Sequence, residues 1–230
     1  MTKKGVSIIL PVWNEVDAIP ALLDQLATIH AFDYEVLFVD GGSNDGSKTL
    51  LKRHSEVLFI ESQKGRAHQL NAGARIAKFE WLYFLHVDST LPTDFDLQLR
   101  TAMNDPQQAA CFSMQFDHKH PLLRLSAYFT KFNFLSCRGG DQSLLIHRHF
   151  FENLGGFDPK FSVCEDLDLI KKIYKHGRFK VLPGPLITAA RRFEKNGVLY
   201  LLLHFGIIHF LHAMGTHPNR LKRYYDYFVV

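Results

Sequence analysis

Cysteine is scarce in this sequence, and its spacing matches neither a metal site nor a disulfide pattern. Cys111, Cys137 and Cys164 are far apart among the 230 residues and form no Cys-x-x-Cys pair. This argues against a zinc knuckle and fits a reducing compartment, so we expect a cytoplasmic protein. Internal repeats, low-complexity tracts and evident linkers are also lacking. With 47% hydrophobic residues, the chain is predicted to form a single domain over 1–230.

Long apolar runs are missing too. The segment from Val6 to Trp13 is short, contains Pro11 and lacks a small-residue cleavage site, so we expect a strand there and no signal peptide. Val198–Ala213 is strongly apolar but too short to span a bilayer. It either packs on the sheet or lies as an interfacial helix beside the basic segment Asn219–Arg223, in peripheral contact with the inner face of a membrane.

Signals of nucleic-acid binding and of two common nucleotide folds are absent. The formal net charge of +4 is modest, and basic residues are not gathered with aromatic ones on one stripe, so no nucleic-acid partner is expected. No Gly-x-Gly-x-x-Gly follows the first apolar segment, and no Gly-Lys-Ser/Thr loop occurs. These absences argue against a dinucleotide fold and a P-loop nucleotidase.

What the sequence does contain is organised around one short apolar stretch. Trp81–Leu85 is unbroken by polar residues and predicts a strand buried on both faces. It is followed by His86, Asp88 and Ser89. Side chains two apart on a strand share a face, so His86 and Asp88 are expected to point the same way. At the carboxyl end of a parallel strand this pair predicts a site for a divalent metal or a charged substrate, although a strand running out into a polar loop would look the same.

The first part of the chain alternates between strand and helix patterns. Such alternation predicts βαβ units, a mostly parallel central sheet and helices on both faces, the α/β class. The expected strands are Val6–Val12, Glu35–Val39, Val57–Ile60 and Trp81–Leu85. Three helices are expected between these strands. The first is capped by Asp17 and has Pro20 in its first turn. The second follows the loop after Asp40 and ends at about His54, and the third covers Gly65–Lys78.

After Pro92 the pattern loosens. Helices are expected at Asp94–Met103, Leu122–Leu135 and Glu165–Tyr174, the last ending at Gly177. Strands are expected at Ala109–Phe116, Gln142–His147 and Phe179–Leu182. The aromatic segment Tyr128–Phe134 is expected in the core, with stacking on an acceptor ring as the alternative.

Four polar loops each follow a strand of the parallel part, and all should open at one sheet edge. They are Pro11–Glu15, Asp40–Ser43, Lys64–Arg66 and His86–Asp88. Gly41 and Gly42 allow close backbone approach, and a helix start just beyond favours an anion. Taken alone, Asp40–Ser43 also fits a tight turn capped by Ser43.

These residues carry a resemblance to a known family. The segments Ser7–Glu15, Val39–Ser47 and Gly65–Gly73, with His86-Val87-Asp88 and Glu165-Asp166, resemble a family 2 glycosyltransferase with the GT-A fold over nearly the whole chain. The stretches Gly140-Asp141-Gln142 and Arg191-Arg192-Phe193 are similar to a bacterial subgroup associated with radical-SAM and selenoprotein-like domains. The resemblance implies a nucleotide-binding half at about 1–92, an acceptor and catalytic half at about 93–193 and a helical tail at about 194–230.

The resemblance also implies roles for single residues. It implies a nucleotide-diphosphate sugar donor bound by Pro11, Asn14, Glu15, Asp40, Gly65 and Arg66. It implies a diphosphate and acceptor side made of Gly140, Asp141, Glu165, Arg191 and Arg192. Asp166 would be the catalytic base. Asp88, with His86 as the second candidate, would hold Mn²⁺ or Mg²⁺.

Two departures from the family pattern affect these roles. The usual Asp-x-Asp is here His86-x-Asp88, which leaves one carboxylate for cations that prefer oxygen ligands. The Gln-x-x-Arg-Trp of processive members is replaced by Ala189–Phe193, so polymer synthesis is not expected.

The expected activity is therefore transfer of a sugar, hexosyltransferase-like and inverting, to an acceptor hydroxyl on a lipid-linked or small molecule. Two alternatives stay open: a sugar-phosphate nucleotidyltransferase, and a catalytically silent module that binds a nucleotide sugar.

Overall fold

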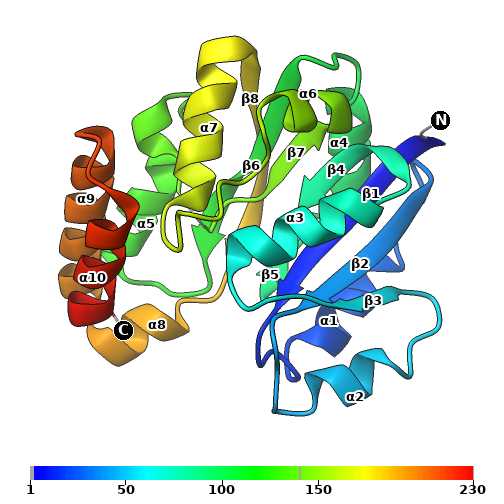
Figure 1. Cartoon of the computed structure of the whole chain (residues 1–230), viewed down its shortest axis with the longest axis horizontal. Coiled ribbons are helices and arrows are strands. Elements are labelled where there is room, and N and C mark those ends of the chain that lie inside the picture. The colour runs from blue at the N-terminus through cyan, green and yellow to red at the C-terminus, as the bar shows by residue number, and fades with distance from the viewer. Residues whose placement is uncertain (1–2, 140, 230) are drawn as a thin grey trace.

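The computed structural model describes residues 3–139 and 141–229, which form one eight-stranded sheet with helices on both faces (Figure 1). The strand order is β3-β2-β1-β4-β7-β6-β8-β5. The strands are β1 Lys3–Val12, β2 Tyr34–Asp40, β3 Leu58–Glu61, β4 Phe79–Phe84, β5 Ser89–Thr90, β6 Gln108–Phe116, β7 Leu144–His147 and β8 Arg178–Thr188.

The sheet is mixed, with a parallel part and an antiparallel part. β3, β2, β1 and β4 pair in parallel, as the alternating pattern predicts. β7 then runs antiparallel to both β4 and β6, while β6 and β8 are parallel and β5 closes the edge antiparallel to β8. In the second half, helices still separate most strands, but the pairing changes between antiparallel and parallel, so the regular βαβ repeat of the first half does not continue.

Period-two alternation along the strands builds two cores, one on each face. Ile8 and Leu10 of β1 face a cluster that contains α1, α2 and α4, whereas Ile9 faces the cluster of α3, α6 and α7. Gly73 lets α3 approach the sheet closely, because a Cβ there would lie 2.5 Å from Ile9 Cγ2. The helices on these two faces are α1 Ile19–Leu26, α2 Ser47–Leu51, α3 Arg66–Ile76, α4 Phe95–Ala102, α6 Arg148–Asn153 and α7 Glu165–His176.

A third cluster lies beyond the sheet at one end of the molecule (Figure 1). It contains α5 Pro121–Phe129, α8 Arg191–Asn196, α9 Val198–Ala213 and α10 Pro218–Phe228. The helix α9 packs against α5, α8 and α10, and its Leu201 and Ile208 share this core with the end of β6. Among the described residues, no helix is both long enough and apolar enough to cross a bilayer.

Several boundaries differ from the sequence-based expectation. Ala18 and not Asp17 occupies the N-cap of α1, although Pro20 does lie in the first turn. The helix expected over Leu122–Leu135 stops at Phe129 and is followed by the 3-10 turn η1 Leu135–Cys137. β8 extends well past Leu182, since pairing with β6 continues to Thr188 across an irregularity in the register. The helix α6 and the short β5 have no counterpart in the predictions, whereas α10 lies inside the helical tail expected at about 194–230 and α8 overlaps its start.

Candidate active site

The loops at the carboxyl ends of β1, β3 and β4 meet the start of α7 and the α8 region at a single open cavity of about 1360 Å³. Most of the residues singled out by the sequence line it. They are Pro11, Glu15, Gly65, Arg66, His86, Asp88, Asp141, Glu165, Asp166, Arg191 and Arg192. Asn14 and Asp40 do not line this cavity, and Gly140 lies outside the described residues.

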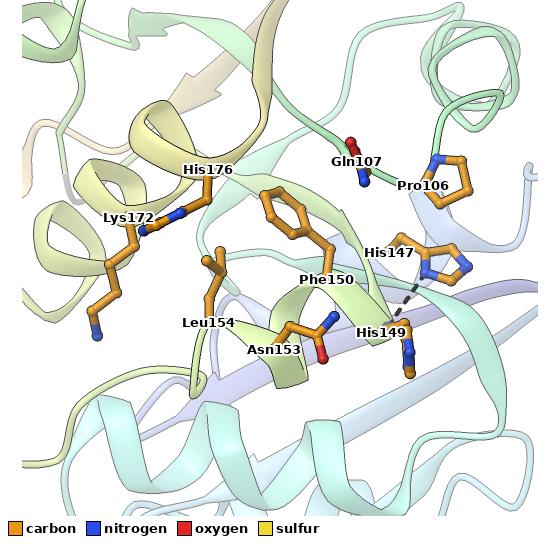
Figure 2. A pocket seen from close by; sticks show the side chains of 9 residues that line it. All are labelled: Pro106, Gln107, His147, His149, Phe150, Asn153, Leu154, Lys172 and His176. Atoms are coloured by element: carbon orange, nitrogen blue, oxygen red, sulfur yellow. Dashed lines mark hydrogen bonds between the residues drawn. The ribbon is translucent and has the colours of Figure 1, made fainter.

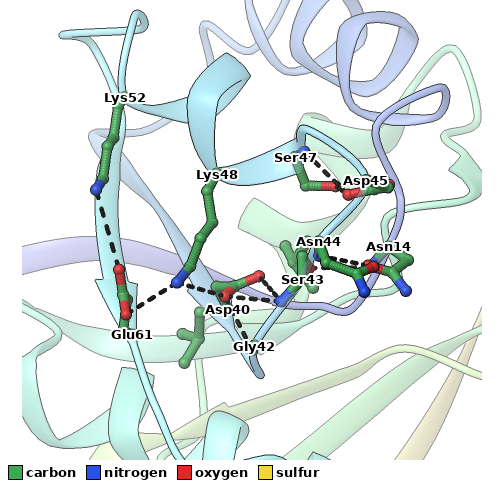
Figure 3. Close-up of polar contacts among 12 residues, drawn as sticks. Asn14, Asp40, Gly42, Ser43, Asn44, Asp45, Ser47, Lys48, Lys52 and Glu61 are labelled. Carbon is green, nitrogen blue, oxygen red and sulfur yellow. Dashed lines mark hydrogen bonds and ion pairs between the residues drawn. The ribbon is translucent and has the colours of Figure 1, made fainter.

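Two of the converging loops are tied together by hydrogen bonds (Figure 3). Asn14 adopts a left-handed conformation with φ of 58°. Its backbone N–H donates to Ser43 Oγ at 2.9 Å, and its Oδ1 accepts from the backbone N–H of Asn44 at 2.9 Å. The next amide, that of Glu15, donates to Ser47 Oγ at 3.1 Å. Asn14 therefore positions the loop that presents Glu15, instead of facing the cavity itself.

Asp40 performs a similar task from inside the protein. Its side chain is fully buried and accepts hydrogen bonds from the backbone N–H groups of Gly42, at 2.9 Å, and Ser43, at 3.1 Å (Figure 3). Lys48 Nζ lies 3.9 Å from Asp40 Oδ2. Gly42 has φ of +96°, a conformation that favours glycine. Asp40 thus holds the loop after β2 in shape, and a donor contact through Asp40 remains a prediction.

Two acids and one arginine meet at the mouth of the cavity. Arg191 Nη2 lies 3.5 Å from Glu15 Oε2 and 3.6 Å from Asp88 Oδ2. Burial raises the pKa of Glu15 above its ordinary value, the neighbouring Asp88 raises it further, and Arg191 partly opposes both. Arg191 therefore compensates the negative charge that the first and fourth loops bring together. It is 176 positions away from Glu15 in the sequence.

A second polar cluster connects the fourth loop to the start of α7. Arg66 Nη2 and His86 Nε2 are 2.5 Å apart, and Arg66 Nη1 lies 3.5 Å from Glu165 Oε1. A guanidinium can only donate, so His86 accepts through Nε2 and carries its proton on Nδ1. Glu165 is only 4% exposed. Burial raises its pKa, while the Arg66 charge opposes the rise. Glu165 is therefore part of a buried ion pair with Arg66.

His86 and Asp88 reach the cavity from a turn and not from the strand itself. β4 ends at Phe84, and the backbone N–H of Ser89 donates to the His86 carbonyl oxygen at 3.3 Å. Both side chains nevertheless line the same cavity. The alternation expected for a strand does not apply here, but the juxtaposition of the two residues is present.

The residues present fit a divalent cation whose coordination shell is completed by phosphate groups of a bound substrate. Asp88 offers a partly exposed carboxylate, and Mg²⁺ or Mn²⁺ is commonly held by one or two carboxylates together with substrate phosphates. His86 Nε2 is engaged by Arg66. Among the described residues, no group of three His, Cys, Asp or Glu side chains is arranged to hold a metal alone. Asp88 is thus the better candidate ligand of the two.

Asp166 lies in the first turn of α7 at the inner wall of the cavity. The residue before this helix, Cys164, has φ of 67°, a left-handed conformation uncommon for a side chain with a Cβ. Asp166 Oδ1 accepts from the backbone N–H of Leu167 at 2.9 Å. The other carboxylate oxygen, Oδ2, is buried and has no hydrogen-bond partner among the described residues. A buried acceptor without a partner on a cavity wall is suited to receive a hydroxyl proton from a ligand.

The remaining predicted residues take positions at the rim. Arg192 donates to the Tyr225 hydroxyl at 2.6 Å, so it connects α8 to α10 as well as lining the cavity. Asp141 lines the cavity beside Gln142.

Sequence reasoning gave no individual role to four further residues of the wall. Lys64 Nζ lies 3.8 Å from the ring centroid of Trp13, which is half exposed at the mouth. Gln142 accepts from the Gly139 N–H at 3.1 Å, while its buried Nε2 has no partner among the described residues. His209 comes from α9, and burial lowers its pKa although the nearby Asp166 opposes this. Trp13 and Gln142 lie inside the motifs quoted above, but no spacing places α9 against α7.

A second hollow, of about 670 Å³, lies away from these loops (Figure 2). It is formed by α6 and the later turns of α7, and His147, His149, His176 and Lys172 are among its lining residues. None of the residues predicted to carry chemistry lines it.

A mixed α/β sheet whose strand-end loops bring acids, an imidazole and arginines to one cavity is the arrangement of a GT-A glycosyltransferase. The chain belongs to glycosyl transferase family 2, whose family model matches residues 7–153. The match ends before α7, so Glu165 and Asp166 lie beyond it.

Individual relatives agree with this assignment. An uncharacterized glycosyltransferase of Haemophilus influenzae is 26% identical over 186 residues, which cover 76% of this chain and 63% of that protein. A PGL/p-HBAD biosynthesis glycosyltransferase of Mycobacterium bovis is 31% identical over 91 residues, 37% of this chain and 36% of that protein.

Solved structures share the fold. The mannosyltransferase PcManGT of Pyrobaculum calidifontis, in complex with GDP-Man and Mn²⁺, has a TM-score of 0.66 and 22% identity over 93% of this chain and 65% of its own. TarS 1-349 of S. aureus, in complex with UDP-GlcNAc, has a TM-score of 0.66 and 15% identity over 90% of this chain and 66% of its own. The chain thus spans 63% of the Haemophilus influenzae protein, 65% of the PcManGT chain, 66% of the TarS 1-349 chain and 36% of the Mycobacterium bovis protein.

Proposed function

We propose that this chain is an inverting glycosyltransferase that moves a sugar from a nucleotide-diphosphate donor to an acceptor hydroxyl. The observation that carries the proposal is the position of Asp166 Oδ2, a buried acceptor without a partner among the described residues, on the wall of the cavity that Asp88 also lines. The same cavity supplies separate groups for the donor and for the acceptor.

The donor nucleotide would bind at the strand-end loops. Pro11 and Glu15 would contact the base and ribose, and Gly65 and Arg66 would lie by the ribose and diphosphate. Asn14 and Asp40 would contribute by holding these loops, and a direct donor contact by either is part of the proposal. Trp13, with Lys64 over its ring, offers a cationic aromatic surface at the mouth.

Asp88 would hold Mn²⁺ or Mg²⁺ together with the donor's diphosphate, and the bound ion would neutralise negative charge on the leaving group. The chain's own arginines serve the same purpose. Arg191 lies between Glu15 and Asp88, and Arg66 lies between His86 and Glu165, so both present positive charge beside the diphosphate position. Arg192 would add to this charge from the rim.

Asp166 would act as the base. As the acceptor oxygen forms a bond to the anomeric carbon, the bond from that carbon to the diphosphate breaks, and the hydroxyl proton passes to Asp166 Oδ2. Attack on the face opposite the leaving group in one step inverts the anomeric centre. Gly140, Asp141 and Gln142 would line the edge of the acceptor pocket.

The finer parts of the proposal concern the substrates and the setting. The sugar complexes of PcManGT and TarS support a hexosyl donor. The acceptor would be a lipid-linked or a small molecule. The chain would be a single cytoplasmic domain in peripheral contact with the inner face of a membrane. Membership of the subgroup associated with radical-SAM and selenoprotein-like domains stays a prediction.

Nucleotide binding is the first test. Uridine or guanosine diphosphate with Mn²⁺ should raise the melting temperature, because a ligand that binds only the native state stabilises it by mass action. Slow donor hydrolysis in the same buffer should follow, with water replacing the acceptor. Binding without any hydrolysis would favour the silent module, and pyrophosphate release from a nucleoside triphosphate and a sugar phosphate would favour the nucleotidyltransferase.

A further inference from the structure

The helix α9 is unusual because it is apolar on both sides, with Leu201 and Ile208 buried in the third core and further large apolar residues exposed on the opposite side. Its sequence contains no Asp, Glu, Lys or Arg. His204 is buried and bonded to the Tyr224 hydroxyl at 2.7 Å, His209 lines the cavity, and the His212 ring lies 5.6 Å from that of Phe161. A surface helix in contact with water normally has charged or polar residues on its outer face.

The outward side of α9 is a continuous apolar stripe along the whole helix. Leu199, Leu203 and Phe210 are 70%, 59% and 64% exposed, and Met214 just past the helix end is 71% exposed. Leu199, Leu203, Gly206 and Phe210 are spaced i, i+4, i+7 and i+11, so they lie on one face of the helix, with Gly206 at the i+7 position. The neighbouring α5 adds exposed Leu125 and Tyr128 at the same end of the molecule (Figure 1). Monomeric proteins rarely expose such surface without a partner.

The charge around the stripe identifies the partner's chemistry. The helix α10, which packs against α9, contains three basic residues, Arg220, Lys222 and Arg223, and one acid, Asp226. Arg220 and Arg223 of α10 are exposed, and the exposed tyrosines Tyr200 and Tyr227 are residues typical of a membrane–water interface. A symmetric contact with a second copy would set this basic region against itself. An anionic surface is complementary to it.

We propose that the outer face of α9, flanked by α10, is a docking surface for a bilayer that contains anionic lipids. With 16 residues at 1.5 Å each, α9 is about 24 Å long, which suits a helix lying in the plane of the interface. Its inner residues Phe205, Ile208 and His209 line the site cavity. Docking through α9 therefore places the cavity close to the membrane surface. Access of an acceptor held in the bilayer to this cavity rests on the glycosyltransferase function proposed above.

Vesicle flotation with the full chain tests this surface. Wild-type protein should float with vesicles of phosphatidylcholine and phosphatidylglycerol, bind pure phosphatidylcholine less, and dissociate in high salt. Leu203→Glu with Phe210→Glu should weaken binding roughly tenfold or more, since apolar burial is lost and two acids oppose the anionic surface. Arg220→Gln with Arg223→Gln should weaken it roughly fivefold for each charge removed.

The matched control is Leu97→Glu, a change at a 51% exposed leucine on α4 of the opposite region, which should float like wild type. The melting temperature and its shift with nucleotide, measured without vesicles, confirm that each variant is folded and report on the donor site separately. The proposal is overturned if wild type ignores anionic vesicles or if Leu203→Glu with Phe210→Glu binds them unchanged. It is equally overturned if wild type is a dimer in solution that these two changes dissociate, because the stripe would then be covered by a second copy.

Discussion

The proposed donor side and the proposed acceptor side of the cavity differ in how many of their polar groups are hydrogen-bonded and how much of their apolar surface is buried. On the donor side, the loops after β1 and β2 are tied by Asn14, Ser43 and the buried Asp40. On the acceptor side, Asp166 Oδ2 and Gln142 Nε2 have no partner among the described residues, and apolar side chains of α5 and α9 are exposed. If the proposed roles hold, the donor side is pre-formed, whereas the acceptor side is completed by what binds there.

The largest effect is expected at Asp166. Asp166→Asn is nearly isosteric and keeps the bond from Leu167, so it should fold normally and bind nucleotide like wild type. It should nevertheless lose transfer by roughly 10²–10⁴-fold, because an amide cannot accept the proton. Transfer rate beside nucleotide affinity checks this, or donor hydrolysis until an acceptor is identified. A rate within a few fold of wild type would remove Asp166 from the role of base.

Glu165→Gln is the companion change at the adjacent position. Because Glu165 is buried against Arg66, this change should lower the melting temperature, unlike Asp166→Asn. Equal melting temperatures of Glu165→Gln and Asp166→Asn would contradict the assignment of a structural role to Glu165 and a proton-accepting role to Asp166.

The next largest effect is expected on the Mn²⁺ dependence of nucleotide binding, which Asp88 and His86 would control. Asp88→Ala should lose the Mn²⁺-dependent part of nucleotide binding while keeping the fold, since this carboxylate contributes little to the core. His86→Ala should retain Mn²⁺ dependence, because His86 Nε2 is engaged by Arg66. Nucleotide titrations with and without Mn²⁺ measure both. Loss of metal dependence in His86→Ala alone would reverse the assignment of the ligand.

A smaller effect, on stability, is expected at Asp40. Asp40→Ala leaves the backbone N–H groups of Gly42 and Ser43 without their acceptor, at a cost of about 1–3 kcal/mol. Its melting temperature should fall and its response to uridine or guanosine diphosphate should be mostly lost. Asp40→Asn, which keeps one acceptor oxygen, is the control and should fall less. An unchanged nucleotide response in Asp40→Ala would show that the donor side does not depend on this loop.

The smallest effect is a pH dependence at Glu15. Because its pKa is raised in the folded state, the native protein holds a proton that the unfolded chain releases above about 4.5, so this residue lowers stability as pH rises through the raised pKa. Glu15→Gln should therefore raise the melting temperature slightly at neutral pH, and the gain should vanish below the ordinary carboxyl pKa, where both states are protonated. A gain that grows toward acid pH would contradict the assigned direction.

Local pattern was sufficient for the parallel part of the fold. Buried β-branched strands, helical periodicity and turn residues are properties of neighbouring residues, so β1 to β4 and α1 to α3 were expected within a few positions of where they lie. The convergence of the strand-end loops follows from parallel pairing alone, and most of the predicted residues do line one cavity. The likeness to family 2 glycosyltransferases rested on the same motifs and is confirmed by the match over residues 7–153.

Long-range packing decided the rest. Nothing near Arg191 in the sequence indicates that it lies between Glu15 and Asp88, or that Glu165 is buried against Arg66. The aromatic segment Tyr128–Phe134 was wrongly expected in the core, because hydrophobicity alone does not tell whether a neighbouring element covers a helix. The orientation of α9, with His204 buried and Leu199 and Leu203 exposed, has the same cause. The sequence by itself determined which residues form strands and which loops carry chemistry. The tertiary structure determined which charges meet and which apolar surface stays open, because both depend on contacts between residues far apart in the chain.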